Sequence, residues 1–211
     1  MKTNQLNANI SAQTWAWLVI FFAVLIWSGI APASRFTWVL EVLPALLGLL
    51  ALAVAYPKFR FTPLVSVLIL LHCLILMVGG HYTYAEVPLF DRLAEWMGSA
   101  RNNFDKLGHF AQGFVPVLVV REIVLRRDII SKPFWVGFFS VCFCLAFSAF
   151  YELLEWWVAL WVGESAEDFL GTQGYIWDTQ SDMFYALIGA VLALALLSRS
   201  HDRQIEAVSP R

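Results

Sequence analysis

The strongest constraint on this chain is a set of apolar segments, each of which is long enough to cross a membrane as a helix. Six such segments cover residues 14–30, 36–56, 64–80, 105–125, 133–161 and 181–197. A helix needs about 20 predominantly apolar residues to span the hydrocarbon core of a bilayer. The chain is 60% hydrophobic and its mean hydropathy is +0.67, more than a soluble domain needs for its core. The sequence therefore predicts an all-α, polytopic membrane bundle of six transmembrane helices.

The basic residues are divided unevenly between the loops. They gather between the second and third segments, between the fourth and fifth, and after the sixth: Lys58, Arg60, Arg121, Arg126, Arg127, Lys132, Arg199, Arg203 and Arg211. The loop after the fifth segment instead carries Glu164, Glu167 and Asp168, with no Lys or Arg. Because Lys and Arg accumulate in cytoplasmic loops, this pattern predicts that both termini lie in the cytoplasm.

The same pattern divides the chain into three parts. We expect a cytoplasmic N-terminal tail at residues 1–13, a transmembrane domain at 14–198 and a cytoplasmic C-terminal tail at 199–211. Small residues around Pro32 resemble a signal-peptidase site, but the preceding apolar run is long and follows a single basic residue. The first segment is therefore expected to be retained as a helix.

The loop between the third and fourth segments carries a second kind of pattern. Its apolar residues recur at helical spacing: Leu89, Phe90, Leu93, Trp96 and Met97. Gly98 then supplies a stop signal. This pattern predicts a short amphipathic helix that lies in the outer membrane interface.

Three of the segments carry ionisable residues at the end that is predicted to face outward. These residues are Asp105 and His109, Glu152 and Glu155, and Asp178 and Asp182. Each pair is spaced by three or four residues, which puts both members on one helix face. Ionisable groups at membrane depth are costly, and they mark functional sites by default. We therefore expect these side chains to meet in one pocket on the outer side.

One imidazole among several carboxylates is the ligand set of a divalent metal such as Mg²⁺, Mn²⁺, Ca²⁺ or Zn²⁺. The expected ligands are His109, Glu152, Asp178, Asp182 and Asp105. A metal there can polarise a phosphoryl or carbonyl oxygen and activate water, with Glu155 as general base. Lys106 would hold an anionic headgroup or neutralise one of the acids. Asp178 alone is equally suited to cap the N-terminus of the sixth helix.

Several classes of protein are excluded or disfavoured. No basic stripe for nucleic acid, phosphate-binding loop, dinucleotide fingerprint or Ser-His-Asp arrangement is found in the sequence. Cys73, Cys142 and Cys144 all lie inside apolar segments, where they are expected to pack as small apolar residues.

The polar stretches also carry a family resemblance. Residues 105–113, residues 148–157 and the stretches 169–174 and 177–183 resemble the bacterial inner-membrane YjdF family over nearly the whole chain. This resemblance implies a multi-pass protein of the bacterial inner membrane, with its site facing the periplasm, and it supplies no reaction.

A looser resemblance is to VanZ-type membrane proteins, which are linked to glycopeptide resistance. The residues that match their outline are Asp105, Lys106, His109, Glu152 and Asp182. The chain departs from that outline by carrying Glu155 and the Gly-Thr-Gln-Gly stretch at residues 171–174. A role on an envelope lipid is what this resemblance implies.

Three functions are consistent with the sequence. The first is a metal-dependent membrane hydrolase or transferase that acts on a lipid-linked substrate or a lipid headgroup. The second is a small proton- or ion-coupled carrier, although the inner halves of the segments are apolar. The third is a structural or stress-related membrane protein in which the acids only pair helices.

Overall fold

The computed structural model describes residues 11–162 and 172–208, and these residues form helices and turns with no strand. The helices are α1 (Ala12–Gly29), α2 (Arg35–Ala55), α3 (Pro63–Tyr82), α4 (Pro88–Met97), α5 (Phe104–Arg126), α6 (Pro133–Val162) and α8 (Asp178–Val208). Six of them are long and apolar enough to span a membrane. The predicted helical membrane bundle is therefore confirmed. Residues 1–10 and the acidic loop at residues 164–168 lie outside the described part.

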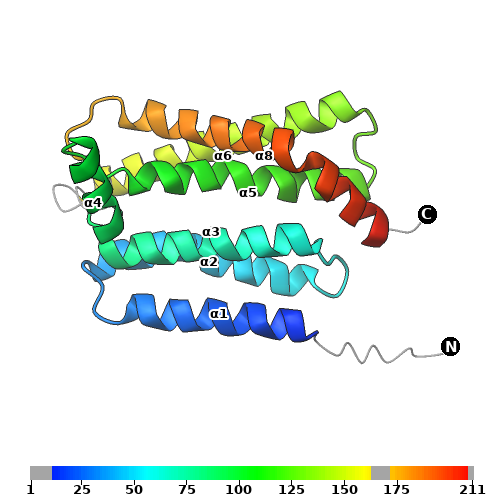
Figure 1. Cartoon of the computed structure of the whole chain (residues 1–211), viewed down its shortest axis with the longest axis horizontal. Coiled ribbons are helices and arrows are strands. Elements are labelled where there is room, and N and C mark those ends of the chain that lie inside the picture. The colour runs from blue at the N-terminus through cyan, green and yellow to red at the C-terminus, as the bar shows by residue number, and fades with distance from the viewer. Residues whose placement is uncertain (1–10, 163–171, 209–211) are drawn as a thin grey trace.

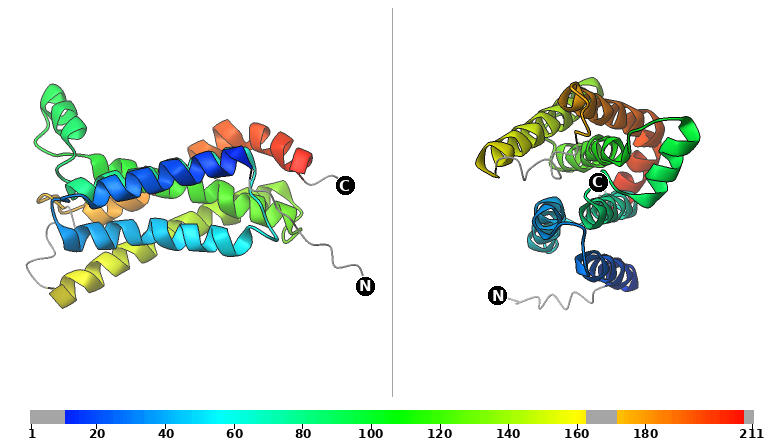
Figure 2. Two further views of the ribbon diagram at one scale, coloured as in Figure 1. Left: turned by 90° about the horizontal axis from the view of Figure 1, so that it is seen from below. Right: turned by 90° about the vertical axis from the view of Figure 1, so that its left-hand side faces the viewer.

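The spanning helices form two groups that lie side by side (Figures 1 and 2). One group contains α1, α2 and α3, and the other contains α5, α6 and α8. Contacts of α3 with α5 join the two groups. The short helix α4 lies at one end of the bundle, and the start of α1 and the end of α8 lie at the other (Figure 1). We refer to the first of these as the α4 end.

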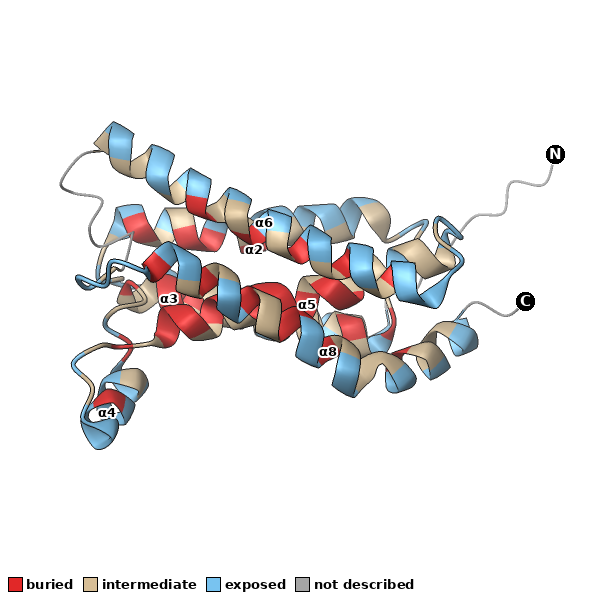
Figure 3. Cartoon of the chain, turned by 90° about the horizontal axis from the view of Figure 1, so that it is seen from above, coloured by how far each residue is buried: buried red, intermediate tan, exposed pale blue. Residues whose placement is uncertain are grey.

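Burial identifies α5 as the central helix of its group. In the most apolar stretch of α5, 44% of the residues are buried, whereas only 11% are buried in the corresponding stretch of α1. The buried residues concentrate on the facing sides of the helices (Figure 3). Helix α1 packs through Phe21 against Met77 of α3, and otherwise presents apolar side chains such as Val19 and Ile26 to its surroundings. This distribution suits a lipid environment, where exposed apolar side chains carry no cost.

The contact between α5 and α8 is the closest in the bundle because glycines bring the two backbones together. A Cβ atom added at Gly113 of α5 would lie 1.8 Å from the carbonyl oxygen of Ala186. A Cβ atom added at Gly189 of α8 would lie 2.1 Å from the carbonyl oxygen of Phe110. Ala190 beside it is fully buried. Small residues allow this kind of close helix packing in membranes.

Helix α4 confirms the predicted amphipathic helix and its stop signal. It ends at Gly98, whose φ of +65° places it in the left-handed region. The Phe90 ring packs edge-on against Phe104 at the start of α5. Trp96 and Leu89 remain 83% and 63% exposed, which is expected of a helix that rests in the membrane interface.

Helix α8 continues well beyond its apolar segment, through residues that the sequence assigned to a tail. His201 is fully buried, and its Nε2 lies 3.0 Å from Oε2 of Glu122 in α5. The Thr62 hydroxyl donates to the same oxygen over 2.8 Å, and Arg126 donates to Oε1 over 2.7 Å. This clasp of Glu122, His201, Thr62 and Arg126 joins α3, α5 and α8 at the end opposite α4. It explains why residues 199–208 are helical.

The crossing of α5 and α8 yields a stability prediction. Gly113→Ala or Gly189→Ala should lower the free energy of unfolding by about 1–3 kcal/mol, because the new methyl group meets a backbone carbonyl that cannot rotate away. Thermal unfolding in detergent measures the effect. The matched control is Gly48→Ala, since nothing lies within 4 Å of a Cβ atom there. An equal loss in Gly48→Ala would show that the crossing is not the cause.

The orientation of the bundle stays a prediction and can be measured. Glu95 on α4 and Asp128 between α5 and α6 are both exposed and lie at opposite ends of the bundle. Glu95→Cys should react with a membrane-impermeant maleimide on intact spheroplasts, whereas Asp128→Cys should react only after lysis. Maleimide labelling of the wild-type chain, which carries the exposed Cys142, gives the background signal. The reverse pattern would place the termini outside the cell.

Candidate functional site

The ionisable residues singled out in the sequence lie at the α4 end, where three helices begin or end. Asp105 and His109 are in the first two turns of α5, and Asp178 and Asp182 are in the first two turns of α8. Glu152 lies ten residues before the end of α6, or about 15 Å along the helix axis. The site therefore lies below the end of α6, and its side chains are buried.

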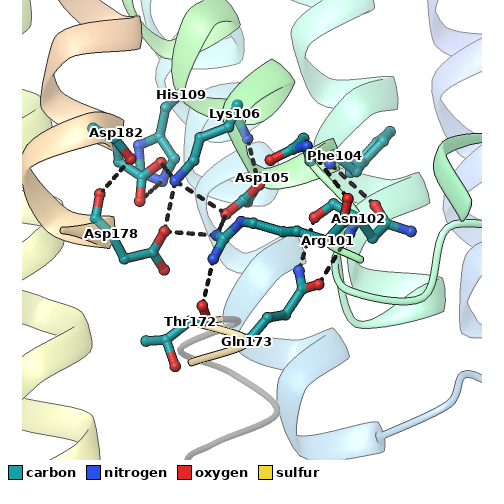
Figure 4. A network of polar contacts seen from close by, with 12 residues as sticks. Arg101, Asn102, Phe104, Asp105, Lys106, His109, Thr172, Gln173, Asp178 and Asp182 are labelled. Carbon is teal, nitrogen blue, oxygen red and sulfur yellow. Dashed lines mark hydrogen bonds and ion pairs between the residues drawn. The ribbon is translucent and has the colours of Figure 1, made fainter. Parts of the chain in front are cut away.

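Lys106 sits at the centre of one half of this site (Figure 4). Its Nζ donates to Oδ1 of Asp178 over 2.6 Å and to Oδ1 of Asp182 over 2.7 Å, and it lies 3.4 Å from Oδ2 of Asp105. An ammonium group has three protons, and two of them are used in these hydrogen bonds, with Asp105 within ion-pair distance. Of the two roles predicted for Lys106, the geometry favours neutralising acids over holding a headgroup.

Arg101 supplies the second cation of this half (Figure 4). Its guanidinium donates to Oδ1 of Asp178 over 2.6 Å, and it also pairs with Asp105 and donates to the carbonyl oxygen of Thr172. Asp178 is the first residue of α8, and its carboxylate bonds to Arg101 and Lys106. We call Arg101, Lys106, Asp105, Asp178 and Asp182 the ion-pair network. It ties the start of α5 to the start of α8.

The turn before α8 is also tied to α4. Asn102 and Gln173 exchange two hydrogen bonds, of 3.0 Å from the Asn102 backbone N–H and 2.7 Å from the Gln173 side-chain amide. The Asn102 side chain donates to Asp91 of α4 over 2.7 Å. Residues 98–103 therefore connect the interfacial helix directly to the rim of the site.

The other half of the site consists of acceptors that face one another. Nε2 of His109 lies 3.8 Å from Oε1 of Glu152 and 3.9 Å from Oδ2 of Asp182. Nδ1 of His109 is 3.1 Å from Oε1 of Gln112, an oxygen that can only accept. With the Gln112 amide in this orientation and the ring neutral, the ring proton is on Nδ1, and the lone pair of Nε2 points toward the two carboxylates.

Glu152 is the member of this group that its surroundings leave unsatisfied. It is 8% exposed, and Oε1 is buried without a hydrogen-bond partner. Glu122 at the other end of the bundle is buried more completely, yet both of its oxygens accept hydrogen bonds. A buried charged oxygen without a donor is expensive, so the comparison distinguishes a structural carboxylate from one that awaits a cation or a proton.

Glu155 lies one turn above Glu152 and faces an opening. A pocket of about 210 Å³ is bordered by Glu152, Glu155 and Asp178, together with Trp156 and two threonines. A neighbouring pocket of about 330 Å³, lined by Tyr175 and Ile176 among others, shares Thr172, Asp178 and Thr179 with the first. Of the candidate residues, His109, Glu152 and Asp182 thus come together, Asp105 and Asp178 belong to the ion-pair network, and Glu155 borders the pocket.

Sequence reasoning missed one acid of this region. Glu41 of α2 is 5% exposed, and the Tyr151 hydroxyl on α6 donates to it over 3.4 Å. Tyr84 stands beside them in a slot between two glycines, since a Cβ atom at Gly79 or Gly108 would lie 2.1 or 2.9 Å from its ring. Burial raises the pKa of the Tyr84 hydroxyl well above its usual range, so the hydroxyl stays protonated. The only signal in the sequence was a lone acid in an apolar helix.

Comparisons with known proteins place the chain in a family. Residues 13–203 match the family described as "Predicted membrane protein (DUF2238)". The chain belongs to this family. It is also 50% identical over 182 residues to "Inner membrane protein YjdF" of Escherichia coli (strain K12), which covers 86% of this chain and 87% of that protein. No solved structure matches the chain.

Family membership and the fold agree on class and location. The six apolar helices fit a multi-pass protein of the inner membrane, as the name of the Escherichia coli relative states. The resemblance to the YjdF family that the polar stretches carry is thereby confirmed. Neither description names a reaction, so the chemistry has to be argued from the site.

The ion-pair network yields a second stability prediction. Lys106→Met should lower the free energy of unfolding by about 3–5 kcal/mol, because it leaves three buried carboxylates with one cation in place of two. Lys132→Met, at an exposed loop position, is the matched control and should change the free energy of unfolding by less than about 0.5 kcal/mol. Chemical denaturation in detergent measures both. Equal effects of the two substitutions would contradict the network as drawn.

Proposed function

We propose that the protein binds a divalent metal ion between His109, Glu152 and Asp182 and uses it in a hydrolase or transferase reaction on an envelope lipid or its headgroup. The observation that carries this proposal is the buried, unpartnered Oε1 of Glu152, which faces the lone pair of His109. Three acceptor atoms that point at one another repel unless a cation or a proton lies between them.

The dimensions of the group suit a metal. The three ligand atoms lie within 4.8 Å of one another. Ligand atoms around a tetrahedral Zn²⁺ at about 2.1 Å are separated by about 3.4 Å. The two distances from His109, 3.8 and 3.9 Å, would have to shorten by about half an ångström, and the distance between the two carboxylates by at most about 1.4 Å. The hydrogen bond from His109 to Gln112 fixes the ring in the orientation that a metal ligand requires.

The charges of the site support the same proposal. Five carboxylates (Asp105, Glu152, Glu155, Asp178 and Asp182) face two basic side chains, Arg101 and Lys106. If all of them are ionised, five negative and two positive charges leave three uncompensated negative charges at membrane depth. A divalent ion would balance two of these three negative charges. This balance matters because uncompensated charges are costly at membrane depth.

The proposed chemistry assigns a role to the neighbouring acid. A bound divalent ion would polarise a phosphoryl or carbonyl oxygen of the substrate and favour ionisation of a water molecule. Glu155, in the adjoining pocket, is placed to accept the proton of that water as general base. The ion-pair network would hold Asp182 in position, because one oxygen of its carboxylate binds Lys106 and the other faces His109.

The alternative that a specific observation favours is a purely structural role. Arg101 and Lys106 are both engaged with acids, as expected if the acids only join helices. That explanation covers Asp105 and Asp178 but not Glu152. Against a carrier, most residues buried below the site are apolar (Val117, Leu118, Cys144, Ala190 and Ala193), although Ser140 and Ser148 of α6 are also buried there.

Metal analysis of the detergent-purified protein tests the proposal. The wild type should hold about one divalent ion per chain, and His109→Ala and Glu152→Gln should hold only background metal. Adding the identified metal should raise the melting temperature of the metal-stripped wild type but not that of Glu152→Gln.

Glu95→Gln, which removes an exposed acid from α4, is the matched control and should retain the wild-type metal content. Background metal in the wild type, with no rise in melting temperature on adding Mg²⁺, Mn²⁺, Ca²⁺ or Zn²⁺, would refute the metal site and leave the structural role.

A further inference from the structure

The charge of the site remains incomplete after a metal is counted. With all five acids ionised and the proposed divalent ion bound, two of the three uncompensated negative charges are balanced and one is left. The remaining acid without a basic partner is Glu155, which borders the 210 Å³ pocket together with Glu152 and Asp178. No Lys or Arg is found among the described residues that line this pocket. The pocket therefore attracts cations and repels anions.

The two nearby bases cannot reverse this charge. Lys106 donates hydrogen bonds to Asp178 and Asp182 and forms an ion pair with Asp105. Arg101 is held by Asp105, Asp178 and the carbonyl oxygen of Thr172. Both cations also lie near the ring of Tyr175, at 5.6 Å for Lys106 and 5.3 Å for Arg101. They bind Asp178 and Thr172, which border the pocket, but neither base is itself among its lining residues.

The walls of the pocket suit an organic cation better than a second metal ion. Trp156 borders it and is 55% exposed, so its indole remains open to a ligand. An ammonium group beside an indole is stabilised by the ring as well as by the carboxylates. Thr172 and Thr179 add hydroxyl groups at the rim. The volume of about 210 Å³ is several times the roughly 30 Å³ of one water molecule, enough for a small headgroup.

We propose that this pocket binds the primary ammonium group of a phospholipid headgroup, so that the substrate is an amine-bearing, zwitterionic lipid. The inference rests on the proposed function, because Glu152 borders the pocket and is also a proposed metal ligand. A phosphate at the metal and an ammonium beside Glu155 and Trp156 would lie on either side of Glu152. An ethanolamine headgroup carries these two charges a few bonds apart. The bound ammonium completes the neutralisation of the five acids.

The first experiment isolates the ammonium subsite from the metal. Binding of ethanolamine to EDTA-treated protein is measured by thermal shift at constant ionic strength, with ethylene glycol as the neutral probe of equal size. Ethanolamine should raise the melting temperature and ethylene glycol should not. Glu155→Gln and Trp156→Ala should each weaken the apparent affinity at least tenfold. Trp161→Ala, which removes a 90% exposed indole from the same helix end, should leave it unchanged.

The outcomes separate this inference from the metal site. Ethanolamine binding in a protein that takes up no metal would retain the ammonium pocket and remove the enzyme proposal. Metal binding without any ethanolamine response would remove the ammonium pocket and retain the metal site. Equal responses to ethanolamine and ethylene glycol, or full affinity in folded Glu155→Gln, would also overturn the inference.

A second comparison identifies the source of the ammonium group. Metal-loaded protein should bind dihexanoyl-phosphatidylethanolamine at least tenfold more tightly than dihexanoyl-phosphatidylglycerol, and more tightly than free phosphoethanolamine. A preference for the glycerol headgroup would overturn the inference. Equal affinity for the lipid and for free phosphoethanolamine would assign the pocket to a soluble ligand and overturn the lipid substrate.

Discussion

The close crossing of α5 and α8 is the contact on which the site depends. Gly113 and Gly189 let the two backbones meet about one turn below His109 and two turns below Asp182. At that separation Lys106 of α5 reaches two aspartates of α8 over 2.6 and 2.7 Å. Helices held at an ordinary distance of 8–10 Å by larger side chains would move these groups apart. The packing of small residues thus comes first, and the polar contacts follow from it.

The acids of the α4 end fall into two groups with different physical roles. Asp105 and Asp178 are paired with Arg101 and Lys106, and their contribution is to hold helices together. Glu152 and Glu155 have no such base among the described residues that surround their pocket. Asp182 belongs to both groups, since its two oxygens face Lys106 and His109 respectively. The ammonium group of Lys106 thereby fixes one carboxylate that is directed at His109.

Much of the fold follows from the sequence because hydropathy and stop signals act locally. The six spans and α4 were predicted, and so was the helix face shared by Asp105 and His109, because each depends on residues within a few turns. The site was predicted as a meeting of three helix ends, for which the charged termini of the apolar segments were sufficient. The family resemblance agreed with this class but carried no geometry.

Other features could not be predicted because they depend on contacts between distant residues. Arg101 reaches Asp178, which lies 77 positions away, and no local pattern indicates this pairing. Glu41 is one acid in an apolar helix, and only the packing of α2 against its neighbours brings it near Tyr151. His201 lies beyond the apolar segment, so hydropathy assigned it to a tail. Its burial depends on Glu122, which is 79 positions earlier.

The Glu122–His201 clasp means that the folding unit is longer than the part of the chain that crosses the bilayer. A truncation chosen from hydropathy alone, at residue 198, would remove the imidazole that covers Oε2 of Glu122 and the Gln204 side chain that accepts the backbone N–H of Leu64. The carboxylate would then stay buried with fewer donors. The last ten described residues close the end of the bundle opposite α4, and expression tags belong beyond them.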